Sequence, residues 1–147
     1  MQDALDPITY ERVKELCERG DELANRAVYE EAVSKYNEAL ELLPHPRSRW
    51  EAATWIFTAL GDAYFLNKDF KQALDALTCA TGCPGGVGNP FIHLRLGQAQ
   101  YQLGNEVIAT DELARAYMGG GENIFQGEDP VYFQLVKNAL RAPPGGW

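Results

Sequence analysis

Few side chains in this sequence have a type and spacing that could support a reaction. The two histidines, His45 and His93, are the candidates for a general base, and no serine, cysteine or histidine arrangement at nucleophile spacing stands out. Acidic residues are numerous, but they are scattered over faces that we expect to be solvated. The sequence therefore predicts a protein that is not an enzyme, with no catalytic residue and no cofactor.

Three cysteines are the candidates for metal or redox chemistry. Cys79 and Cys83 are four residues apart near an expected helix end, but a zinc site needs about four ligands and no histidine pair follows at metal-ligand spacing. Together with Cys17 they make an odd count, which is typical of reduced thiols in the cytosol. We expect buried or half-buried thiols and no metal site.

Two glycine-rich segments, 85–88 and 119–121, could in principle cradle a phosphate group. A phosphate loop lies between a strand and a helix, whereas both of these segments follow expected helices. In that position glycines end helices and act as hinges. We therefore expect no phosphate site.

The charge balance is acidic, with a formal net charge of -8 over 147 residues. The first 43 residues hold 11 acids and 5 bases, so -6 of this charge lies in the N-terminal third. This distribution argues against nucleic acid as a partner. Two interpretations stay open: the acids keep the protein soluble, or they form a surface that attracts a basic protein.

The composition is that of a globular protein, with 46% hydrophobic and 11% aromatic residues. No run approaches the roughly 18 apolar residues that a membrane span needs. The N-terminal segment 1–6 is acidic and lacks the basic start and apolar run of a secretory signal. We therefore expect a cytoplasmic protein that does not contact a membrane.

The elements that position these groups follow from a pattern that occurs three times, beginning at Gly20, Gly61 and Gly97. After each glycine, large residues follow at +3 and +16, alanines at +12 and +19, and a proline or glycine at +24, with Gln100 as the exception. The small residues let two antiparallel helices approach closely, and the breaker ends the second helix. Each unit is therefore predicted to be a helical hairpin.

Capping signals agree with this frame. Asp6, Asn89 and Asp129 each precede a proline, which suits the first position of a helix, and Ser48 with Glu51 has the spacing of a capping box. The predicted helices cover about 7–27, 29–43, 48–66, 70–81, 90–103, 106–118 and 129–141.

We expect residues 1–141 to form a single domain, with hairpins at about 7–43, 48–81 and 90–118. The last helix, 129–141, has an apolar face and should cap the exposed end of the third hairpin. Residues 142–147, rich in proline and glycine, are expected to be a flexible tail.

The repeated pattern resembles the tetratricopeptide repeat, whose period is about 34 residues. The resemblance covers residues 9–121, although the repeat glycines are 41 and 36 residues apart, so the first junction carries extra residues. It implies an all-α fold, a right-handed superhelix of three hairpins plus the capping helix. It also puts a core residue where His93 lies, so we interpret this histidine as packed.

In such a solenoid the first helix of each hairpin, here called the leading helix, lines a concave face. Its positions carry four aromatic residues and a line of acids, which favours a protein-binding groove. The alternative is that an individual ring such as Trp55 or Phe91 packs against its neighbours. The residues that we expect to bind a partner are Asp21, Trp55, Thr58, Asp62, Phe65, Phe91, Leu94, Arg95, Gln98 and Tyr101.

Some tetratricopeptide-repeat proteins hold the C-terminal carboxylate of heat-shock chaperones with lysine, asparagine and arginine. Only Arg95 matches that clamp here, so a co-chaperone role is disfavoured. The ending, with 116–121 followed by Ile124-Phe125 and 128–133, is similar to that of small bacterial immunity proteins encoded beside toxins of the Rhs and type VI secretion kind. It implies that the groove binds and neutralises a basic toxin domain. A type III secretion chaperone and a generic scaffold adaptor are the alternatives.

Overall fold

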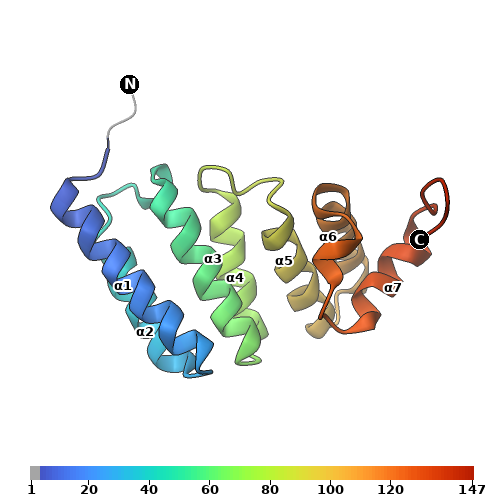
Figure 1. Cartoon of the computed structure of the whole chain (residues 1–147), viewed down its shortest axis with the longest axis horizontal. Helices are drawn as coiled ribbons and strands as arrows, with labels where there is room; N and C mark the ends of the chain where they lie inside the picture. The colour runs from blue at the N-terminus through green and yellow to red at the C-terminus, as the bar shows by residue number, and fades with distance from the viewer. Residues whose placement is uncertain (1–3) are drawn as a thin grey trace.

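A computed structural model describes residues 4–147, and these residues form seven α-helices, two short 3-10 helices and no strand (Figure 1). The helices succeed one another along the length of the molecule, so that α1 and α7 lie at opposite ends of the row. The elements are α1 (Pro7–Asn25), α2 (Tyr29–Glu41), η1 (Arg47–Arg49), α3 (Glu51–Leu66), α4 (Phe70–Thr81), α5 (Pro90–Gln102), α6 (Glu106–Gly120), η2 (Glu122–Phe125) and α7 (Pro130–Ala139). The predicted all-α fold and its seven helices are confirmed.

The repeat glycines lie where the two helices of each hairpin are in tight contact. A Cβ atom added to Gly20, Gly61 or Gly97 would lie 2.5, 2.4 or 2.6 Å from the side chain sixteen residues later in the sequence. Those side chains are Tyr36 and its counterparts Leu77 and Leu113, all buried. The alanines at the repeated positions +12 and +19 are fully buried as well. The repeated small residues therefore lie at the contact between the two helices of each hairpin, as predicted.

Three of the four predicted capping signals are confirmed. The side chains of Asp6, Asn89 and Asp129 accept hydrogen bonds from backbone N–H groups in the first turn of α1, α5 and α7.

The capping box at Ser48 and Glu51 is wrong, because Ser48 lies in η1 and α3 begins after Trp50 without a side-chain cap. The Trp50 ring is buried, and its indole N–H donates to the carbonyl oxygen of Pro44 at 2.8 Å. The backbone of Trp50 is extended, with φ -97° and ψ 136°, and α3 starts at the next residue, Glu51.

Helix α7 covers the end of the third hairpin, as predicted. Tyr132 and Val136 of α7 and Phe125 of η2 pack in one core cluster with Leu94 and Leu113. At the end of the chain, the centre of the Trp147 ring lies 5.4 Å from that of Tyr117 and 5.5 Å from that of Phe133. Across residues 4–147, no helix is both long and apolar enough to cross a membrane.

Candidate functional site

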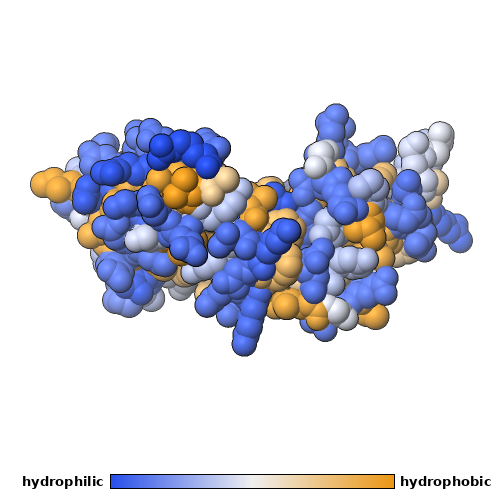
Figure 2. All heavy atoms as spheres, turned by 90° about the horizontal axis from the view of Figure 1, so that it is seen from below, coloured by the Kyte–Doolittle hydropathy of each residue, from blue (hydrophilic) through white to orange (hydrophobic). Residues whose placement is uncertain are grey.

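The leading helices α1, α3 and α5 are neighbours in space, as expected for one continuous face. The space-filling view from below shows a largely hydrophilic surface with apolar side chains between the polar ones (Figure 2). Its outline is indented along one long edge, between the N-terminal and C-terminal ends of the molecule. The side chains of the leading helices differ sharply between those two ends.

At the N-terminal end, the face is open and aromatic. Trp55 of α3 is 43% exposed and Tyr10 of α1 is 40% exposed, and their rings meet edge to face at 6.2 Å with an interplanar angle of 84°. Thr58 lies one turn further along α3, half-buried, and its hydroxyl donates to the carbonyl oxygen of Thr54 at 2.7 Å. Trp55 therefore has the exposure that a binding residue needs.

A cavity of about 540 Å³ lies beside Trp55, between the first turns of α1 and α3. The residues that line it are Ala4, Leu5, Pro7, Tyr10, Glu11, Trp50, Glu51, Ala52 and Trp55. The residues expected to bind include Trp55 but neither Tyr10 nor Trp50, because both lie further from the repeat glycine than the expected groove positions. Tyr10 lies ten residues before Gly20, and Trp50 lies just outside α3.

Asp21 and its neighbours form a polar site on α1. The Asp21 carboxylate is exposed and accepts a hydrogen bond of 2.6 Å from the Tyr36 hydroxyl of α2. Burial and this hydrogen bond raise the pKa of Tyr36 far above its usual value. Burial, together with the charges of Asp21 and Glu18, raises the pKa of the Cys17 thiol to about 11. Cys17 is therefore a neutral thiol at physiological pH, unsuited to nucleophilic chemistry.

The middle of the face is occupied by a cluster centred on Arg95 of α5. Its Nε donates to Asp62 Oδ1 of α3 at 2.8 Å, and its Nη1 donates to Gln98 Oε1 and to Glu128 Oε1, both at 2.7 Å. Gln98 Nε2 also donates to Glu128 Oε1, at 2.6 Å. Glu128 lies between η2 and α7, so the C-terminal segment supplies the second carboxylate.

Two aromatic rings flank this arginine. The guanidinium carbon of Arg95 lies 4.8 Å from the centre of the Phe65 ring and 5.0 Å from that of Phe91. Both rings are half-buried. They hold the guanidinium in place by cation–π contact, so they are partly committed to the protein's own arginine.

The expectation that the third leading helix is open is wrong for three residues. Arg95 is 7% exposed, Leu94 is 2% exposed and Gln98 is fully buried, because η2, α7 and the residues between them cover α5. Tyr101 is half-buried, with its ring 5.7 Å from that of Tyr132 in α7. These side chains hold the C-terminal segment onto the third hairpin, so the accessible part of the face lies on α1 and α3.

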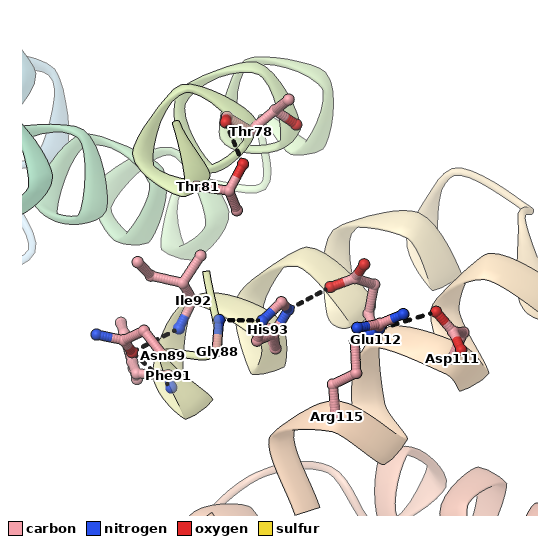
Figure 3. Close-up of polar contacts among 10 residues, drawn as sticks. All are labelled: Thr78, Thr81, Gly88, Asn89, Phe91, Ile92, His93, Asp111, Glu112 and Arg115. Carbon is pink, nitrogen blue, oxygen red and sulfur yellow. Dashed lines mark hydrogen bonds and ion pairs between the residues drawn. The ribbon is translucent and has the colours of Figure 1, made fainter. Parts of the chain in front are cut away.

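His93 is a packed residue, as predicted (Figure 3). Its Nε2 accepts a hydrogen bond of 3.0 Å from the Gly88 N–H, and its Nδ1 lies 2.7 Å from Glu112 Oε2 of α6. Since the amide can only donate, Nε2 must be unprotonated and Nδ1 must carry the hydrogen. The ring thus joins the loop before α5 to α6, with both nitrogens engaged.

The described residues contain no group of three or more histidine, cysteine or acidic side chains placed to hold a metal ion. Of the cysteines, Cys79 is exposed and Cys83 is buried, and burial raises the pKa of the Cys83 thiol. The Cys83 thiol donates to the Cys79 carbonyl oxygen at 3.3 Å. This contact is that of a packed thiol at the end of a helix.

Comparison with known proteins gives no family model and no curated protein that matches the chain. Among solved structures, the chain is similar to the C-terminal TPR-containing domain of a Plasmodium falciparum protein named as an FK506-binding protein. The TM-score is 0.75 at 21% sequence identity, over 93% of this chain and 96% of that domain. The similarity, together with the helical hairpins described above, shows that the chain has the fold of a tetratricopeptide-repeat domain.

Proposed function

We propose that this chain is a protein-binding module that binds its partner through the exposed N-terminal part of the leading-helix face. The observation that carries this proposal is the wall formed by Trp55 and Tyr10, two large rings that stay accessible beside an open cavity. Exposed aromatic residues next to a pocket are typical of binding hot spots. The part of the face around Arg95 is covered by the protein's own C-terminal segment, so we do not expect it to bind the partner directly.

The partner that we favour is a basic toxin domain, which this chain would bind and neutralise as an immunity protein. Two observations support this choice: the ending of the chain resembles that of small immunity proteins, and the N-terminal third carries most of the net negative charge. Opposite charges steer two proteins together and set their register. An immunity protein needs no reaction of its own, in agreement with the packed His93 and the neutral Cys17.

Co-expression with the product of the neighbouring open reading frame tests the immunity proposal. We expect that product to be lethal alone and tolerated when this chain is present. If the product is harmless alone, or still lethal beside this chain, the immunity proposal fails.

Substitution of Trp55 tests which face binds. Trp55→Ala should weaken binding of the partner by about 2 kcal/mol, as for a central hot-spot residue. Its effect on folding should be smaller, because the side chain is 43% exposed. Val107→Ala, at an exposed apolar residue of α6, is the matched control and should leave affinity unchanged. Calorimetric titration of both variants measures the difference, and equal affinities would show that another face binds.

A secretion chaperone of the type III class is the second candidate. A second cavity, lined by Pro7, Ile8, Glu11, Arg12 and Glu15, shares Pro7 and Glu11 with the first, so the two could accept an extended segment. A short peptide of the partner that displaces the whole partner would favour the chaperone. An immunity protein recognises a folded domain, so such a peptide would compete weakly.

A further inference from the structure

The cavity between α1 and α3 has walls of two kinds. Its apolar walls come from Leu5, Tyr10, Trp50 and Trp55, while Glu11 and Glu51 are exposed acidic residues of its lining. Lysine and arginine are absent from the residues that line it. Its volume of about 540 Å³ lies within the range of about 300–1,000 Å³ that is usual for binding pockets.

The aromatic walls are held in place before any partner arrives. The Trp50 indole N–H is bonded to Pro44, and the Arg49 guanidinium lies 4.6 Å from the centre of the Trp50 ring. Trp55 is braced by the edge contact with Tyr10. A partner that enters this pocket does not have to order these rings, which lowers the entropic penalty of binding.

The acidic residues of the pocket determine which partner residues can lie beside the side chain that enters it. Glu11 and Glu51 would repel a neighbouring carboxylate and attract a neighbouring lysine or arginine. The adjoining cavity adds Glu15, which is paired with Arg12 at 3.7 Å with both side chains largely exposed. An exposed ion pair of this kind is weak. The preference for a basic partner residue therefore depends mainly on Glu11 and Glu51.

We propose that this pocket receives a large apolar side chain of a partner protein, and that lysine or arginine residues flank this side chain in the partner. The inference rests on the proposed function and adds to it the chemistry of the segment that is bound. It differs from a general attraction between an acidic and a basic protein, because it requires an apolar and a basic residue side by side at one place.

The three tryptophans provide a direct readout in the unmodified protein. Trp50 and Trp55 line the pocket, whereas Trp147 packs on Tyr117 and Phe133 near the other end of the molecule. In a ¹H–¹⁵N spectrum each indole N–H gives its own signal. The signals of Trp50 and Trp55 therefore report on the pocket, and the signal of Trp147 is an internal reference.

The probes are three unlabelled tetrapeptide amides: Lys-Leu-Phe-Arg, the acidic analogue Glu-Leu-Phe-Glu and the apolar-deficient analogue Lys-Ser-Gly-Arg. We expect the first peptide to shift the signals of Trp50 and Trp55 with saturation and to leave Trp147 unmoved. The other two should bind at least about tenfold more weakly, since each lacks one of the two required features.

A pair of charge variants tests the edge. Glu11→Gln with Glu51→Gln should weaken binding of Lys-Leu-Phe-Arg by roughly three- to tenfold, as expected for two exposed charges. Glu22→Gln with Glu41→Gln changes the net charge by the same amount at exposed residues away from the pocket, and should have no such effect.

Three results would overturn the inference: no shift of the Trp50 and Trp55 signals, an equal shift with the acidic peptide, or equal weakening in both charge variants. The proposed function is judged separately. Trp55→Ala could weaken binding of the whole partner while the peptides give a negative result. In that case the proposed face is supported and the inferred side-chain chemistry is wrong. If Trp55→Ala has no effect on the partner, the proposed face itself is wrong.

Discussion

At the residue scale, the effect of replacing a glycine depends on what lies beside it. A Cβ atom on Gly61 would lie 2.4 Å from Leu77 Cγ, closer than the branched carbon of a buried leucine can tolerate. Gly82 ends α4 with φ -84°, and a Cβ atom there would meet only the Cys79 carbonyl oxygen at 3.5 Å. The two glycines are therefore a matched pair for testing the hairpin contact.

Gly61→Ala should lower the free energy of unfolding by about 1–3 kcal/mol, because the added methyl group forces α3 and α4 apart. Gly82→Ala should change it by less than about 0.5 kcal/mol, since that site has ordinary contacts. Urea unfolding followed by circular dichroism measures both. Similar stabilities for the two variants would show that close approach at the repeat glycine is not what holds the hairpin together.

Cysteine reactivity provides a second test at this scale. Because the pKa of Cys17 is raised to about 11 from 9.0, its thiolate population near pH 8 should be about a hundredfold lower than that of an unperturbed thiol. Alkylation at pH 8, followed by mass spectrometry, should label the exposed Cys79 first and Cys17 much later. Because the folded state holds the Cys17 proton more tightly, the protonated thiol adds to the free energy of unfolding fully below pH 9, and this addition is lost as pH rises through about 11. Equal labelling rates would contradict a half-buried, neutral Cys17.

At the scale of elements, the contact between α5 and the C-terminal segment depends on Glu128. This carboxylate accepts from Arg95 at 2.7 Å and from Gln98 at 2.6 Å, and both donors are buried. Glu128→Ala should lower the free energy of unfolding by about 1–3 kcal/mol, because it leaves the buried Gln98 Nε2 without its acceptor and removes one of the two carboxylates paired with Arg95. It should also speed amide hydrogen exchange in α7 more than in α1, since α7 follows Glu128 directly.

Glu122→Ala is the control for this change, since Glu122 is an exposed glutamate of η2. It should leave both stability and exchange in α7 near those of the parent protein. If Glu128→Ala behaves like Glu122→Ala, the Arg95 cluster does not hold the C-terminal segment in place.

The helices and their pairing into hairpins could be predicted from spacing, whereas individual side-chain contacts between distant segments could not. Three helices begin directly after Asp6, Asn89 and Asp129, as predicted, because capping depends on residues within one turn. The capping box at Ser48 was predicted wrongly, because Trp50 is buried with an extended backbone and α3 starts only after it. The open face was predicted correctly at Trp55. It was predicted wrongly at Gln98, because the residue that covers it lies 30 positions further along the chain.

At the scale of the whole molecule, the two ends have different roles. The C-terminal end is closed by α7 and by the aromatic contacts of Trp147, as the last unit of a repeat array requires. The N-terminal end leaves Tyr10 and Trp55 accessible beside an apolar cavity and carries most of the negative charge. We therefore propose that the N-terminal end of the leading-helix face is the one that meets a partner, while the C-terminal end is covered by the protein's own segments.

Hydrogen exchange of the chain with and without the product of the neighbouring open reading frame tests this claim most directly. The account predicts slower exchange in α1 and in the first turns of α3, around Tyr10 and Trp55, with little change in α2, α4 and α6. Protection confined to α2, α4 and α6, or to α7, would contradict it.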